Sequence, residues 1–155
     1  MEVPEGAQSM IKASVILLAY RQEGFISAAL DSLMNQEIAP HEVIVVDDRS
    51  PDSTAGIIES FISSKGQQWH FIRKERNEGV VAALRSALRV ASGNVIVIAA
   101  GDDISAPSRV ATTADFFDGN PGSFGLILGA SVMDAGGRLT GRTVNCPSRL
   151  PARLS

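Results

Sequence analysis

The chain has little cysteine and no long apolar run, and both absences narrow what it can be. Its single cysteine, Cys146, excludes an internal disulfide and a metal site built from several cysteines, so we expect a reducing compartment. The longest apolar runs, near residues 13–20 and 94–100, fall far short of the roughly 18 residues that a membrane span needs. No basic segment followed by an apolar one opens the sequence, which argues against a secretory signal. We therefore expect a cytoplasmic protein with no membrane span.

Positive charge is also scarce. The 14 lysines and arginines stand against 17 aspartates and glutamates, and the formal net charge is -3. A chain with this balance has no electrostatic footprint for nucleic acid or for an anionic membrane surface, so neither is an expected partner. What the chain does have is 45% hydrophobic residues over 155 positions, enough for one globular domain with a buried core.

Short apolar runs alternate with segments of helical period along most of the chain. The apolar runs predict strands over residues 13–19, 42–46, 69–72, 95–99 and 124–133. The periodic segments between them predict helices over residues 25–34, 51–62, 80–90 and 107–117. Strands that alternate with helices predict an α/β fold with a mostly parallel sheet and helices on both of its faces.

Two of the predicted strands end in paired aspartates. Asp47 and Asp48 follow the second strand, and Asp102 and Asp103 follow the fourth. Ligands of open α/β sheets bind beyond the carboxyl ends of the strands. If the strand order is 3-2-1-4, the two acidic ends flank the first strand at about 10 Å from each other.

A site of that width suits a nucleotide. One acidic end could accept hydrogen bonds from the base or sugar, while the other could hold a divalent cation over the phosphates, and carboxylate oxygens favour Mg²⁺ or Mn²⁺. Aspartate is also common in turns and helix caps, so either pair alone is explained equally well by turn chemistry. Two pairs at matching strand ends favour a site.

Several ordered motifs between about residue 13 and about residue 139 carry a resemblance to a known family. They are Ser14-Val15-Ile16-Leu17-Leu18-Ala19-Tyr20, Ala29-Leu30-Asp31-Ser32-Leu33 with Gln36, Glu42-Val43-Ile44-Val45-Val46-Asp47-Asp48 with Ser50, Asp52 and Thr54, Asn77 with Gly79, Gly101-Asp102-Asp103 with Pro107, and Asp134 with Gly137. With these motifs the chain resembles the family 2 glycosyltransferases. The resemblance implies the Rossmann-like GT-A fold, with sheet order 3-2-1-4 plus a fifth strand.

The resemblance also implies a ligand and the residues that hold it. The family binds a nucleotide-diphosphate sugar with a divalent cation for inverting glycosyl transfer, and a UDP-sugar is the expected donor here. The nucleotide-binding positions would be Ala19, Tyr20, Arg21, Glu23, Asp47, Asp48, Asn77, Gly79 and Asp102. Asp102 and Asp103 would hold the Mn²⁺ or Mg²⁺. Since successive strand side chains point to opposite faces, we expect only one of Asp47 and Asp48 to reach the ligand.

The chain departs from the family pattern at two of these motifs. Arg21 stands where the family usually has asparagine, and it could contact phosphate or form a surface ion pair with Glu23. The stretch from Ala100 to Asp103 reads Ala-Gly-Asp-Asp where Asp-Ala-Asp-Asp is commoner. Fewer carboxylates should bind the metal more weakly.

The end of the sequence bears on catalysis. In the family, the acceptor-binding half and the general base follow the fifth strand, but Asp134 is the last acidic residue here. We therefore expect a C-terminally truncated, donor-binding half whose catalytic base is unknown, and whose acceptor is an unknown glycan, lipid or small molecule. The expected organisation is a polar lead-in over residues 1–12, the GT-A domain over 13–137 and an irregular basic tail over 138–155. A sheet truncated in this way would expose apolar surface, which makes a homo-oligomer possible.

Two alternatives stay open. A non-catalytic nucleotide-sugar-binding module shares every motif with the enzyme, and turnover alone separates the two. A receiver-like signalling domain would need an aspartate after the third strand, where Arg73 and Lys74 stand, and a lysine after the fifth, where none occurs. Trp69 is expected to pack in the core or at a sheet edge, with an aromatic beside a sugar site as the alternative.

Overall fold

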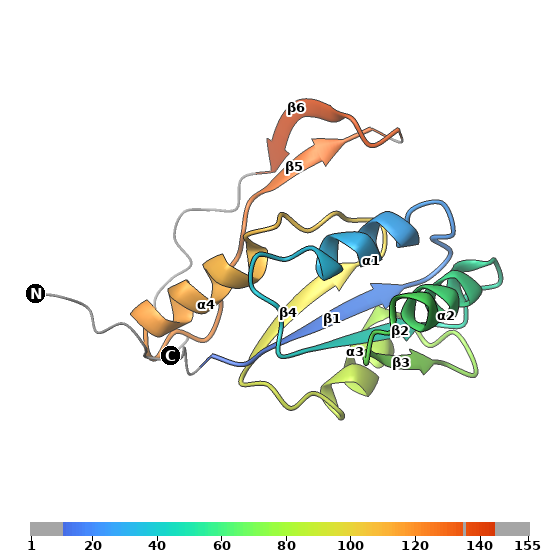
Figure 1. Cartoon of the computed structure of the whole chain (residues 1–155), viewed down its shortest axis with the longest axis horizontal. Helices are drawn as coiled ribbons and strands as arrows, with labels where there is room; N and C mark the ends of the chain where they lie inside the picture. Colours follow the sequence, from blue (N-terminus) through green and yellow to red (C-terminus); the bar gives the residue numbers. More distant parts are fainter. Residues whose placement is uncertain (1–10, 135, 145–155) are drawn as a thin grey trace, which may run out of the picture. The chain divides into compact units, whose positions relative to one another are not determined.

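The structure, a computed structural model, describes residues 11–134 and 136–144. Cys146, most of the predicted lead-in and the end of the predicted tail lie outside these residues. The chain forms two compact units, one up to Pro121 and one from Gly122 (Figure 1). The predicted limits of the functional domain, residues 13 and 137, stay predictions. The elements are β1 (Ala13–Ala19), α1 (Ile26–Met34), β2 (Glu42–Asp47), α2 (Thr54–Lys65), β3 (His70–Arg73), α3 (Val80–Leu88), β4 (Val95–Ala100), α4 (Arg109–Gly119), β5 (Ala130–Met133) and β6 (Leu139–Val144).

The first unit is built on a parallel sheet in the order β3-β2-β1-β4, as predicted. The two central strands are apolar on both faces, and nearly every residue of each is buried. Helices cover both faces, which confirms the α/β prediction. Side chains of α1, α2 and α4 pack on one face, where Ile26, Leu30 and Ile58 are fully buried, and α3 packs on the other through Ala83 and Ala87.

Helix α2 begins later than predicted. Proline at position 51 suggested a helix start, but α2 begins at Thr54. The residues before it form a turn held by two carboxylates: Asp47 accepts the N–H of Ser50, and Asp52 accepts both the N–H and the hydroxyl of Thr54. Side-chain acceptors of this kind compete with the backbone and delay the helix.

The second unit corrects two predictions. The expected fifth strand over residues 124–133 is shorter, and β5 pairs antiparallel with β6 in a sheet of its own. Residues 139–144, expected to be irregular, form β6. The reason is a tight turn, because the Asp134 carboxylate accepts the N–H groups of Gly136 and Arg138, and Gly137 has a φ of 78° that glycine adopts without strain.

The described helices are all too short or too polar to cross a membrane.

Candidate functional site

The two acidic strand ends lie on either side of β1, as predicted. Asp47 at the end of β2 is in register with Ala19, and Ala100 at the end of β4 is in register with Leu18. The pairing continues past the strands, since Asp48 donates its N–H to the Ala19 carbonyl and Gly101 donates to that of Leu18. The three carboxyl ends therefore form one rim.

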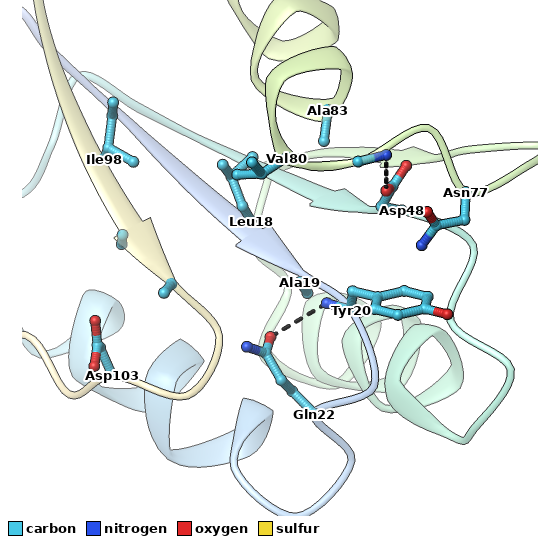
Figure 2. A pocket seen from close by; sticks show the side chains of 13 residues that line it. Leu18, Ala19, Tyr20, Gln22, Asp48, Asn77, Val80, Ala83, Ile98 and Asp103 are labelled. Atoms are coloured by element: carbon cyan, nitrogen blue, oxygen red, sulfur yellow. Dashed lines mark hydrogen bonds between the residues drawn. The ribbon is translucent and has the colours of Figure 1, made fainter.

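A cavity of about 570 Å³ opens at this rim, within the size range of about 300–1,000 Å³ that is usual for small-molecule sites. Figure 2 shows Asp48, Asn77 and Tyr20 on one side of it and Asp103 on the other, with Leu18, Val80 and Ile98 as the apolar part of its wall. Its lining residues are Leu18, Ala19, Tyr20, Gln22, Asp48, Asn77, Gly79, Val80, Ala83, Ile98, Ala99, Ala100 and Asp103.

Asp48 joins the end of β2 to the loop before α3. It is 5% exposed, and its carboxylate accepts the N–H of Glu78 at 3.1 Å and that of Gly79 at 2.7 Å. Gly79 has a φ of 84°, a backbone conformation that favours glycine. Asp48 thus fixes the loop that places Asn77 at the cavity.

Ion pairs stiffen the same loop from outside. The Glu78 carboxylate forms ion pairs with the ammonium of Lys74 at 2.5 Å and with the guanidinium of Arg76 at 3.1 Å. The hydrogen bond from Lys74, followed by that from Arg76, lowers the pKa of Glu78. Two cations of the loop are therefore already paired with a carboxylate of the same loop.

Asp47 has a different role from its neighbour. Its side chain is fully buried, one oxygen accepts the N–H of Ser50 at 3.0 Å, and the other has no hydrogen-bond partner among the described residues. Asp48 lines the cavity and Asp47 does not, and which of the two contacts a ligand stays a prediction.

The turns after β1 and β2 contain two strained arginines. Arg21 has a φ of 55° and Arg49 one of 61°, values that are uncommon for residues other than glycine and cost about 1–3 kcal/mol each. The Ser50 hydroxyl holds the first turn by accepting the N–H of Arg21 at 3.0 Å. The side chain of Arg21 is exposed and does not line the cavity.

Glu23 connects the same two turns. Its carboxylate accepts the N–H of Ser53 at 3.0 Å, and its own N–H points to the carboxylate of Asp52 at 3.4 Å. The structure places Glu23 outside the cavity lining, as a link between loops.

The other acidic end is open. Asp102 and Asp103 are both exposed, and Asp103 lines the cavity. Arg109, at the start of α4, donates to the carbonyl of Ile98 and to the hydroxyl of Ser105. Burial lowers the pKa of Arg109, and the charge of Asp103 opposes that shift. Within residues 11–134 and 136–144, no group of three or more histidine, cysteine, aspartate or glutamate side chains is placed to hold a metal.

Gly101 makes a close approach that a larger residue would prevent. A Cβ atom at this position would lie 2.3 Å from Oε1 of Gln22 and 2.9 Å from Cδ1 of Ile26. That Gln22 oxygen also accepts the N–H of Tyr20 at 3.3 Å (Figure 2). Gln22 therefore packs the turn after β1 against the turn after β4, across the rim.

Six of the predicted site residues line the cavity: Ala19, Tyr20, Asp48, Asn77, Gly79 and Asp103. Four others lie outside the lining: Arg21, Glu23, Asp47 and Asp102. The roles of all ten residues toward a ligand stay predictions. Sequence reasoning missed Gln22, Val80 and Ile98. The sequence did contain one signal for Ile98, because the alternation of strand side chains shows which residues share its face of β4. Whether that face is exposed depends on the elements that cover it.

Comparison with known proteins agrees with this geometry. Residues 14–148 match the model of the family described as glycosyl transferase family 2. The chain is 34% identical over 91 residues to the Escherichia coli protein named UDP-Glc:alpha-D-GlcNAc-diphosphoundecaprenol beta-1,3-glucosyltransferase WfgD, covering 59% of this chain and 35% of that protein.

Two solved structures share the fold. The mannosyltransferase PcManGT from Pyrobaculum calidifontis, in complex with GDP-Man and Mn²⁺, superposes with a TM-score of 0.64 at 26% identity, over 69% of this chain and 32% of that one. Residues 1–349 of S. aureus TarS, in complex with UDP-GlcNAc, give a TM-score of 0.63 at 30% identity, over 70% and 32%. The chain spans about a third of the length of these relatives. It belongs to glycosyltransferase family 2, as its motifs predicted.

Proposed function

We propose that this chain binds a UDP-sugar together with a divalent cation, as the donor-binding part of an inverting glycosyltransferase. The observation that carries the proposal is the cavity at the carboxyl rim of the sheet. It has a buried, hydrogen-bonded carboxylate, Asp48, on one side of β1 and an exposed one, Asp103, on the other. A nucleotide diphosphate fits these two ends differently, because its neutral base can donate an N–H to a carboxylate, whereas its charged diphosphate needs a cation between it and a carboxylate.

The base would lie on the Asp48 side. The aromatic ring of Tyr20 and the amide of Asn77 line that side, and an aromatic ring is a favourable surface for a planar base (Figure 2). Asp48 accepts two backbone N–H groups, and an ionised carboxylate has about four lone-pair sites. It therefore keeps the capacity to accept an N–H from uracil as well.

The diphosphate would lie on the side of Asp102 and Asp103. Their oxygens suit Mn²⁺ or Mg²⁺, and the described residues offer no further carboxylate or histidine for a cluster of three, so ligand oxygens would have to complete the coordination. A cation held by these two carboxylates would offset the charge that develops on a leaving diphosphate. The charge of Asp103 raises the pKa of Arg109 against the effect of burial, so the two side chains lie close together. The Arg109 guanidinium therefore offsets part of the negative charge on this side.

The relatives support a nucleotide sugar but differ in its base. The name of WfgD includes UDP-Glc and the TarS structure contains UDP-GlcNAc, whereas the PcManGT structure contains GDP-Man and Mn²⁺. We infer uracil from the first two. Inversion requires a general base on the acceptor side.

Calorimetric titration with UDP, GDP and uridine, each with Mn²⁺ or with a chelator, tests the proposal. We expect UDP with Mn²⁺ to bind most tightly, and at one hundred times its dissociation constant it should stabilise the fold by about 2.7 kcal/mol. Equal affinity for UDP with and without metal would remove the cation from the proposal. Tighter binding of GDP would replace uracil by guanine.

A rival function, a binding module without turnover, has the same donor site. Release of UDP from a UDP-sugar in the presence of glycan acceptors distinguishes the two. Tight donor binding without acceptor-dependent release by the longest natural form of the protein would favour the module.

A further inference from the structure

A second cavity lies at the amino ends of β2 and β3, the opposite end of the sheet from the donor site. Its volume is about 510 Å³, similar to that of the cavity at the carboxyl rim. In Figure 1 this end lies at the tails of the strand arrows, beside the end of α1. The lining residues are Leu33, Met34, Gln36, Ala39, Pro40, His41, Glu42, Val43, Gln67, Gln68, Trp69 and His70. No residue of the donor cavity is among them.

Trp69, the only tryptophan of the chain, supplies a fixed aromatic surface in this cavity. It is half-buried and stacks on Phe61, with the ring centroids 5.8 Å apart and the rings inclined by 30°. A ring that neighbouring side chains already hold in place loses little conformational entropy when a ligand covers it. The apolar floor beside it comes from Leu33 and Val43, which belong to the core.

Besides one carboxylate, the polar groups of the cavity are amides and imidazoles. Gln68 and His70 are exposed, and Gln67 and His41 line the same space. Amides both donate and accept hydrogen bonds, and so does a neutral imidazole through its two nitrogens. An aromatic surface beside several such groups suits the alternating C–H faces and hydroxyls of a sugar ring.

The Glu42 carboxylate disfavours anionic ligands, and the group that faces it across the cavity wall is Nε2 of His70, at 3.7 Å from Oε2. Glu42 accepts hydrogen bonds from the Ser14 hydroxyl, from the N–H and hydroxyl of Ser92 and, at 3.3 Å, from the N–H of Gly93. Burial raises the pKa of Glu42, but these hydrogen bonds outweigh burial and bring the pKa down to about 2. Glu42 is therefore negative at neutral pH, and no lysine or arginine lines the cavity to balance a phosphate or carboxylate.

We propose that this cavity binds a neutral oligosaccharide, in a carbohydrate site separate from the donor site. Trp69 would stack on a sugar ring, and Gln67, Gln68 and His70 would hydrogen-bond its hydroxyls. Oε2 of Glu42, which lies 3.7 Å from Nε2 of His70, would accept a further hydroxyl. The proposal does not depend on the proposed function, because it uses none of the same residues. Such a site would keep a glycan attached to the protein at the far end of the sheet from the nucleotide.

Tryptophan fluorescence tests the proposal directly, because the single tryptophan lies in the cavity. We expect cellopentaose, maltopentaose or chitopentaose to shift the emission of the whole chain in a saturable way with a millimolar or lower dissociation constant. Replacement of Gln68 by alanine should weaken the effective sugar about five- to tenfold, the loss of one hydrogen bond. Ser63→Ala, an exposed substitution on α2 outside the cavity, should titrate as the unmodified chain does.

Two controls separate this site from the donor site and from loss of the fold. UDP with Mn²⁺ should leave the Trp69 emission unchanged. Calorimetry on Trp69→Phe, which retains an aromatic ring on Phe61, should show at least a severalfold loss of sugar affinity with an unchanged melting profile. If Trp69→Phe does not fold, the comparison of Gln68→Ala with Ser63→Ala decides. No saturable shift with any of the three sugars, or equal titration of Gln68→Ala and the unmodified chain, would overturn the proposal.

Discussion

The two acidic strand ends are alike in sequence and differ in structure. At the end of β2, Asp47 and Asp48 are buried, and both accept backbone N–H groups from the loops beside them. At the end of β4, Asp102 and Asp103 are exposed, and the turn that carries them approaches the turn after β1 through Gln22. The first end is thus tied to the fold by hydrogen bonds, whereas the second is open to solvent. A carboxylate pair after a strand can therefore organise a site or bind in it, and the surrounding backbone decides which.

The largest expected effect is at the buried end. Asp48→Ala leaves the N–H groups of Glu78 and Gly79 without their acceptor, and hydrogen bonds to a charged group contribute about 1.5–3 kcal/mol each. We expect a loss of about 3 kcal/mol in the free energy of unfolding, together with loss of uridine binding with or without metal. Chemical denaturation and calorimetry measure the two. Asp115→Ala, at an exposed position of α4, is the matched control and should change neither by much.

Glu42, at the amino ends of the strands, tests whether a second hydrogen-bonded carboxylate also stabilises the fold. Glu42→Gln should cost about 2 kcal/mol at neutral pH, because its hydrogen-bonded charge is lost. The pKa of Glu42 lies at about 2, below its usual 4.5, so the unfolded chain binds the proton more readily. Its contribution is therefore complete above about pH 4.5 and is lost as the pH falls toward 2.

Melting temperatures between pH 2 and pH 7 measure that contribution as the difference between Glu42→Gln and the unmodified chain. The difference should shrink as the pH falls. A difference that stays constant over the whole range would mean that the ionised form of Glu42 is not what stabilises the fold.

The close approach at the rim predicts a smaller effect. Gly101→Ala forces the new Cβ against Gln22 and Ile26, and overpacking of this kind costs about 1–3 kcal/mol. The loss should be partly restored by Gln22→Ala in the same chain, because the nearest clash is with the end of that side chain. Gly56→Ala, in a helix with open space around the position, should be neutral or stabilising by about 0.5–1 kcal/mol. Thermal unfolding of the three variants measures these effects, and an absence of rescue by Gln22→Ala would rule out the proposed contact.

The smallest effect on stability is expected at the open end. Asp102→Asn should change the free energy of unfolding by less than about 0.5 kcal/mol, since the side chain is exposed. It should nevertheless weaken UDP binding in the presence of Mn²⁺ and leave uridine binding unchanged, because an amide keeps the shape but loses the charge that holds a hard cation. Asp118→Asn, another exposed aspartate, serves as the control. Equal loss of uridine and UDP affinity in Asp102→Asn would contradict the proposal that this end binds the cation while Asp48 contacts the base.

Much of the main sheet could be predicted from local sequence. The strand over residues 13–19 has the predicted limits, and the second and fourth strands differ from prediction by one residue. Uninterrupted apolar runs between polar residues are a strong signal for buried parallel strands. The start of α2 was wrong because the acceptors that delay it belong to Asp47 and Asp52, whose geometry depends on the folded turn.

Part of the cavity lining was predicted for the same reason, whereas the ligand contacts stay predictions. Ala19, Asp48, Asn77 and Gly79 stand in motifs of fixed spacing, and they do line the cavity. The apolar residues Val80 and Ile98 were missed because an exposed apolar side chain is recognised only once the covering of its face is known. The hairpin of β5 and β6 was missed because its turn depends on three hydrogen-bonded residues rather than on an apolar pattern.

By itself the sequence determined the alternation of strands and helices, the family and the presence of two acidic strand ends, because apolar periodicity and motif spacing are properties of neighbouring residues. Only the tertiary structure decided that Asp48 holds a loop and lines the cavity, that Asp47 is buried behind it, and that Asp102 and Asp103 stay open to solvent. It also decided that Trp69 lies at the opposite end of the sheet from the cavity at the carboxyl rim. The loop that Asp48 holds is about 30 positions away in the sequence, as its hydrogen bond with Gly79 shows, and a linear pattern does not contain contacts over such separations.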